Sequence, residues 1–297
     1  MTAESAVAIA MGRLAEDSIG FDHPAEAWCA HDSLASEDWL EAWTGDAGQG
    51  PAYVTEYHVI DEEGKLHVSR ASSEGLATLG MGPDQIAALF DWIDGDDLAQ
   101  AGGAENEYYL SLSPSYYCKN APVEILDELV AVRGFSLADY LGEDANHNGL
   151  LDGNEDDGNY RYPPDDANGR LAPGWVNLLT CLGDGLTNLN TAPRKVLETL
   201  PISQTAVGQI IGYRAFDANS LGELEDHAFR SAEDIDQLQG LSELDRDVLK
   251  VLCTFQSTHF RIFARSEHIP TGLSYEIEVV VRRGGTWPEV LQWKVRP

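Results

Sequence analysis

Residues 259–281 read HFRIFARSEHIPTGLSYEIEVVV, and this stretch decides how the rest of the 297-residue chain is interpreted. Both of its halves, 259–265 and 275–281, have the residue pattern of β-strands. A further strand is predicted at 290–295, after a turn of two glycines. The chain is therefore expected to end in three strands.

A matching strand lies far upstream, at residues 52–60 (AYVTEYHVI). A turn at 61–64 and a return over 65–68 predict a β-hairpin there. Between about 82 and 255 the sequence is typical of helices broken by loops of Gly, Asp, Asn and Pro. Two groups of strands that flank a helical block indicate one antiparallel sheet interrupted by an insertion, which is an α+β architecture. The expected domains are 1–78 plus 256–297, and 79–255.

An amphipathic helix is predicted over residues 3–17, with Val7, Ile9, Ala10 and Leu14 on its apolar side. The sequence begins directly in helical rhythm, and it contains neither a signal peptide nor the roughly 18 apolar residues of a membrane span. We therefore expect a segment upstream of this helix in the full-length protein. The other predicted helices are 83–93, 122–132, 136–141, 192–199, 203–214, 231–237 and 242–252.

The composition is strongly acidic, with 19 Lys and Arg residues against 50 Asp and Glu residues, a formal charge of −31. Such a field repels nucleic-acid phosphates and anionic lipid headgroups, so binding to either surface is disfavoured. Divalent cations would relieve the self-repulsion. The alternative is an acidic surface that is simply solvated.

The four cysteines, Cys29, Cys118, Cys181 and Cys253, are widely spaced and form no CxxC pair. A zinc or redox motif is therefore disfavoured. Disulfides and isolated buried thiols both stay open.

Residues 144–155, DANHNGLLDGNE, fit the calcium-loop template at every position. Gly149 permits the sharp turn. No exit helix follows, so a structural clamp is favoured over a sensor that opens paired helices. The predicted ligands are Asp144, Asn146, Asn148, the carbonyl of Leu150, Asp152 and Glu155.

Two further oxygen-rich segments are weaker candidates for cation sites. The first holds Asp94, Asp96 and Asp97 with Glu105 nearby, and the second holds Asp165 and Asp166. For both, the alternative is ordinary turn chemistry.

Residues 91–97 (DWIDGDD) and 103–109 (GAENEYY) resemble the "DWxDxDD … GAExxYY" signature of the general secretion pathway protein K family. The likeness continues in the same order at 116–122 (YYCKNAP), 188–193 (NLNTAP) and 257–265 (STHFRIFAR). Each piece alone is weak, but their shared order over nearly the whole chain is specific.

This resemblance implies a pseudopilin fold, with a helix on an antiparallel sheet and a calcium-binding helical domain inserted between strands. It implies a minor pseudopilin of a type II secretion system, placed near the pseudopilus tip with I- and J-type partners. It also implies an N-terminal transmembrane helix, absent from this sequence, that anchors the protein in the inner membrane with its soluble domain in the periplasm.

Two rival functions were weighed. Residues 188–214 and 229–251 resemble the halves of a helix-hairpin-helix nucleic-acid-binding unit, but the hairpin at 200–204 lacks the glycines that let backbone amides approach phosphate. The acids at 94–105 suggest a metal-dependent hydrolase. No HExxH, GxSxG or P-loop motif supports an enzyme. We therefore expect a non-catalytic protein that does not bind nucleic acid.

Overall fold

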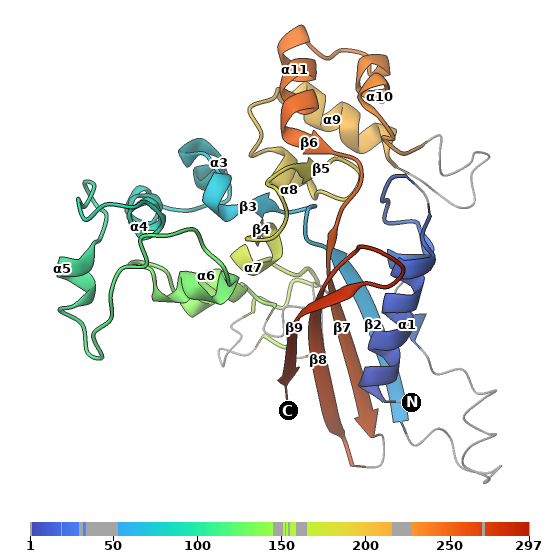
Figure 1. The fold of residues 1–297 in the computed structure, drawn as a ribbon, viewed down its shortest axis with the longest axis horizontal. Helices are drawn as coiled ribbons and strands as arrows, with labels where there is room; N and C mark the ends of the chain where they lie inside the picture. The colour runs from blue at the N-terminus through green and yellow to red at the C-terminus, as the bar shows by residue number, and fades with distance from the viewer. Residues whose placement is uncertain are drawn as a thin grey trace.

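A five-stranded sheet packed against one long helix forms one part of the molecule (Figure 1). The strand order is β1-β2-β7-β8-β9, and every pair is antiparallel. Its strands are β1 (Asp32–Ser33), β2 (Tyr53–Asp61), β7 (His259–His268), β8 (Leu273–Arg282) and β9 (Glu289–Arg296). The computed structural model describes residues 2–18, 20–29, 32–33, 53–144, 151, 153, 155–158, 165–215, 227–268 and 271–296.

Helix α1 (Ala3–Glu16) covers one face of this sheet (Figure 1). The hydroxyl of Thr2 accepts a hydrogen bond from the backbone N–H of Ser5 and caps the first turn. Burying a side chain such as Leu14 contributes roughly 2 kcal/mol. The buried residues recur at helical spacing and pack on alternate residues of β2, β7 and β8; they are Ala3, Ala6, Val7, Ala10, Met11 and Leu14. The predicted helix over 3–17 is confirmed, although Ile9 is only half-buried.

The predicted hairpin over 52–68 is wrong. Strand β2 pairs along its whole length with β7, about two hundred residues away, and β3 (Leu66–His67) pairs in parallel with β4 (Leu179–Thr180). The acids at 62 and 63 cause the difference, because both side chains are buried and bonded to distant residues. The chain therefore leaves the sheet after Asp61 and enters the insert.

The insert between β2 and β7 is mainly helical and has its own apolar cluster, distinct from the cluster under α1. Among the described residues, no helix is long and apolar enough to cross a membrane. The four cysteines are free thiols. The insert elements are η2 (Val68–Arg70), α3 (Ser73–Thr78), α4 (Pro83–Ile93), α5 (Asn106–Tyr109), η3 (Leu126–Ala131), α6 (Leu137–Leu141), α7 (Trp175–Leu178), β5 (Thr187–Asn188), α8 (Arg194–Leu197), α9 (Gln204–Tyr213), α10 (Ala232–Gln237), α11 (Glu243–Leu252) and β6 (Cys253–Thr254); η1 (Ala27–Cys29) precedes the sheet strands.

The predicted helices therefore exist with two main corrections. Residues 126–131 form a short 3-10 helix instead of an α-helix over 122–132, because the Glu128 carboxylate accepts the backbone N–H groups of Glu124 and Ile125 and fixes a turn. The helix predicted at 192–199 is one turn, Arg194–Leu197.

The side chains of Leu66, Val68 and Leu76, which come before the predicted domain boundary at 78, pack in the apolar cluster of the insert. The boundaries proposed at 78 and 256 stay a prediction.

A buried ionic network holds the insert to the sheet. The Glu62 carboxylate has no exposed surface and accepts hydrogen bonds from Lys65 Nζ at 2.9 Å and Arg261 Nε at 2.7 Å. The hydroxyl of Thr180 donates to it from β4 at 2.7 Å, and Arg261 also pairs with Glu278 on β8. Burial alone would raise the pKa of Glu62, but the Arg261 and Lys65 charges outweigh burial and hold the pKa below its usual range.

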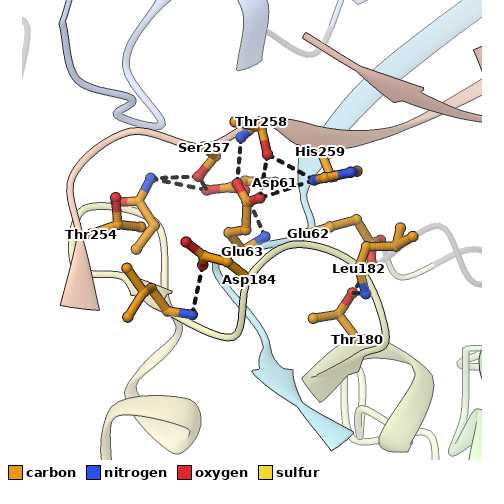
Figure 2. Close-up of polar contacts among 12 residues, drawn as sticks. Asp61, Glu62, Glu63, Thr180, Leu182, Asp184, Thr254, Ser257, Thr258 and His259 are labelled. Atoms are coloured by element: carbon orange, nitrogen blue, oxygen red, sulfur yellow. Dashed lines mark hydrogen bonds and ion pairs between the residues drawn. The ribbon is translucent and has the colours of Figure 1, made fainter. Parts of the chain in front are cut away.

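A second set of contacts joins the segment after β2 to the segment before β7 (Figure 2). The Glu63 carboxylate accepts the hydroxyl of Thr258 at 2.7 Å and lies 3.0 Å from His259 Nδ1. The hydroxyl of Ser257 donates to Asp61 at 2.8 Å. Burial raises the pKa of Asp61 to about 7. The acids of the short segment 61–63 therefore bond to residues at both connections between the sheet and the insert.

Replacing Glu62 by Ala is expected to lower the free energy of unfolding by about 3–5 kcal/mol, because Lys65 and Arg261 would stay buried without their shared carboxylate. The matched control is Glu289→Ala, which breaks the exposed Arg282–Glu289 pair and should cost less than about 1 kcal/mol. Urea unfolding measures both changes. Equal effects would contradict the importance given to the network.

Candidate calcium sites

Three carboxylates gather directly after α4. Asp94, Asp96 and Glu105 each offer an oxygen, and the three oxygens lie within 4.8 Å of one another. The loop between them folds back because the carboxylate of Asp91, on α4, accepts the backbone N–H of Gln100. Sequence reasoning proposed this set, and the structure brings three of its four members together.

The loop can return this closely only because residue 103 is glycine. A Cβ atom at Gly103 would lie 2.0 Å from an Asp91 carboxylate oxygen. The fourth proposed ligand, Asp97, lies outside the cluster of three. Its Oδ1 accepts the side-chain amides of Asn106 at 2.7 Å and Asn120 at 3.0 Å. Asp97 therefore organises the loop around the three acids.

Glu105 is the most buried member of the three. Its side chain is 4% exposed, and within the described part of the chain neither carboxylate oxygen accepts a hydrogen bond. Burial raises the pKa of Glu105; the nearby Cys118 thiol acts against the rise, and the charges of Asp91, Asp94 and Asp97 add to it. A buried carboxylate without a partner is costly. An all-oxygen, all-carboxylate set of this kind suits calcium.

The predicted calcium loop at 144–155 is described at its two ends. Asp144 has no exposed surface and Glu155 is 1% exposed, so the first and last predicted ligands are both buried carboxylates. The side-chain amide of Asn177 donates to Asp144. Burial of both end acids fits the ligand positions of such a loop. The other predicted ligands lie outside the described residues; they are Asn146, Asn148, Leu150 and Asp152.

Asp165 and Asp166 have a different role. Oδ1 of Asp165 accepts the backbone N–H groups of Gly158 at 2.8 Å and Ala167 at 3.0 Å, and Asp166 closes a similar turn onto Asn168. Neither belongs to a three-ligand cluster of the described residues. They act here as turn residues that fix the chain just after Glu155.

Sequence reasoning missed a third acidic group. Asp17, Asp22 and Glu26, in the loop after α1, place one oxygen each within 4.8 Å of one another. Their spacing matches no metal-binding template, and the loop is brought together by contacts with residues near 255 and 283. The sequence alone therefore contained no usable signal for this cluster.

The helix-hairpin-helix segments use their hairpin amides internally. The backbone N–H of Ser203, before α9, donates to Asp245 at 2.7 Å, and that of Ser242, before α11, donates to the same carboxylate at 3.0 Å. The hydrogen bond from Ser203 contributes most, and together with that from Ser242 it lowers the pKa of Asp245 to about 2. An ionised carboxylate therefore lies at the turns of both hairpins. Its charge opposes the approach of a nucleic-acid phosphate.

Replacing Glu105 by Gln should have opposite effects with and without calcium. In EDTA at neutral pH the variant should melt at a higher temperature, because a buried charge is removed. Since the folded-state pKa is raised, this advantage should disappear below about pH 4, where the carboxyl is protonated in both states.

With calcium, the same variant should bind the ion about tenfold to a hundredfold more weakly, since losing one charged ligand costs on the order of 1.5–3 kcal/mol. Calorimetry and thermal melting check both halves. A Glu107→Gln variant, on exposed surface of the neighbouring helix, serves as control. Lower stability of Glu105→Gln in EDTA would contradict the account.

Part of this sequence is similar to known proteins of a secretion system. Residues 71–157 match the family described as type II secretion system (T2SS), protein K. A 54-residue segment is 41% identical to "Type II secretion system protein K" of Klebsiella pneumoniae, and it covers 18% of this chain and 17% of that relative.

The fold also resembles a chain in "The Crystal Structure of the GspK-GspI-GspJ complex from enterotoxigenic Escherichia coli Type 2 Secretion System". The TM-score is 0.61 at 14% sequence identity, and the match covers 99% of this chain and 94% of that chain. At this identity the likeness concerns the fold alone. These findings confirm the resemblance to the K family and the α+β fold class.

Proposed function

We propose that this chain, whose residues 71–157 match the type II secretion system protein K family, is a non-catalytic minor pseudopilin. The observation that supports this most is the whole-chain fold, in which a helix-covered sheet is interrupted by a helical insert. In the proposed function, the protein helps to initiate or cap a short pilus-like fibre near its tip.

The partners in this proposal are I- and J-type minor pseudopilins. The similar solved fold comes from a crystal structure of a GspK-GspI-GspJ complex. A hydrophobic segment continuing α1 upstream would anchor the full-length protein in the inner membrane, with the described part in the periplasm. Nucleic acid is not among the proposed partners. The negative net charge repels phosphate groups, and the Asp245 carboxylate already accepts the backbone N–H of Ser203 in the hairpin.

The outer strand β9 offers a contact surface for such partners. It lies at the edge of the sheet, and its side chains of Leu291, Trp293 and Val295 are each more than 40% exposed. Exposed edge strands with apolar side chains invite pairing or packing with another chain. The account therefore assigns β9 to a partner interface.

Calcium has a structural task in the proposed function. The acids at 94, 96 and 105 lie close enough to repel one another, and the acids at both ends of 144–155 are buried. Calcium would hold these loops of the insert in one arrangement. The ion performs no chemistry on a substrate in this proposal.

Purified I- and J-type pseudopilin domains should form a ternary complex with this chain, as measured by size-exclusion chromatography with light scattering. Trp293→Ser should weaken the complex about tenfold or more, because a buried aromatic anchor in an interface is worth at least 1–2 kcal/mol.

The control is Leu98→Ser, an equally apolar but fully peripheral position of the insert that is 78% exposed. No complex at micromolar concentrations, with all three proteins folded, would contradict the proposed function. Equal weakening by both variants would contradict the assignment of β9.

Calorimetric titration of the EDTA-stripped chain should show calcium binding with a raised melting temperature. The double variant Asp144→Ala/Glu155→Ala should lose one ion, because both end ligands of the loop are removed. Asp156→Ala/Asp157→Ala, with acids just outside the predicted loop, is the control. An unchanged number of bound ions in the first variant would reject the site at 144–155.

A further inference from the structure

The loop that follows α1 concentrates negative charge in a buried place. Asp22 has no exposed surface, Glu26 is 7% exposed, and the side chain of Asp17 is 7% exposed. Each offers an oxygen within 4.8 Å of the other two. Two oxygens that bind one calcium ion at 2.3–2.6 Å lie at most about 5 Å apart, and each pair of these oxygens meets that limit.

One cation of the protein is already present, but it does not balance the site. Arg283 Nη2 lies 2.9 Å from Asp17 and 2.7 Å from Asp22, with its guanidinium over the ring of Phe260. When all three carboxylates are ionised, one guanidinium leaves two negative charges. No salt bridge joins Glu26 to Arg283 among the described residues.

Glu26 gives an independent sign of an absent ligand. The indole N–H of Trp28 donates to its Oε2 at 2.6 Å, whereas its Oε1 is shielded from solvent and accepts no hydrogen bond in the described part of the chain. A buried carboxylate oxygen of this kind calls for a cation or a proton.

The position of the cluster adds to the argument. Asp17 is the C-cap of α1, where the helix dipole is negative and an acid is unfavourable without a cation. The Asp22 carboxylate accepts a hydrogen bond from the backbone N–H of Ser257, just before β7. The backbone N–H of Asp22 donates to the carbonyl of Phe255. Arg283 follows β8. A cation here would fix the end of α1 to the point where the insert rejoins the sheet (Figure 1).

We propose that Asp17, Asp22 and Glu26 form a calcium site in the sheet domain, separate from the candidate sites of the insert. Calcium is favoured over magnesium because three carboxylates from an irregular loop suit its flexible coordination of six to eight oxygens. Two positive charges from the ion bring the site, with Arg283, to neutrality.

The first test counts bound calcium by equilibrium dialysis of the whole chain. Glu26→Gln keeps an oxygen for the Trp28 indole but removes the charge, and it should lose one ion per chain relative to wild type. Glu16→Gln, an exposed acid at the end of the same helix, should lose none. Equal numbers of ions in wild type and Glu26→Gln would overturn the proposal.

A second test isolates the site with terbium as a calcium probe. The variant Asp94→Asn/Glu105→Gln/Asp144→Asn/Glu155→Gln lacks the insert sites. Terbium emission excited through tryptophan should persist in it, since the Trp28 indole contacts a proposed ligand. Adding Glu26→Gln should lower terbium affinity roughly tenfold or more.

Adding Trp28→Phe instead should reduce the emission severalfold while dialysis still finds the ion. Absence of terbium binding in the four-fold variant, with the sheet domain folded, would overturn the proposal. It would leave a proton on Glu26 as the explanation of its buried oxygen.

Discussion

The buried carboxylate of Glu62 is the contact on which the arrangement of this molecule depends. It joins Lys65 on the way into the insert, Thr180 within the insert and Arg261 on β7, and through Arg261 it reaches Glu278 on β8. Removing one partner of a buried charge strongly destabilises a folded protein. This network therefore fixes the position of the insert on the sheet. The apolar clusters on either side are separate.

Acidity is used in two ways in this chain. At the junction, acids are paired with arginine, lysine and hydroxyl groups, so they join segments without a metal ion. At 94–105 and after α1, three acids each place an oxygen within 4.8 Å of one another, and the acids at the ends of 144–155 are buried. Part of the formal charge of −31 is therefore gathered in clusters of acids, and not spread evenly over a solvated surface.

Much of the fold was predictable because its signals are local. Helix α4 begins and ends at the predicted residues, and the strands after residue 259 follow their β-branched and aromatic pattern. The acids at 94, 96 and 105 could also be predicted to lie close together, because they belong to one short loop. The amide partners of Asp97 at 106 and 120 are set by the fold, so the sequence did not predict them.

What the sequence could not predict depends on distant partners. The acids at 62 and 63 have the composition of a hairpin turn, and only Arg261 and Thr258, nearly two hundred residues away, make them a buried junction. The cluster of Asp17, Asp22 and Glu26 likewise exists because Ser257 and Arg283 hold the loop against the sheet. No local pattern contains that information.

The central claim, that calcium orders acid-rich loops on a preformed fold, is tested most directly by hydrogen-exchange mass spectrometry with and without the ion. The account predicts that calcium slows exchange at 94–105 and 144–158 and leaves the amides of β7 and β8 nearly unchanged. Exchange that is the same in both conditions, or that changes uniformly over the whole chain, would contradict it.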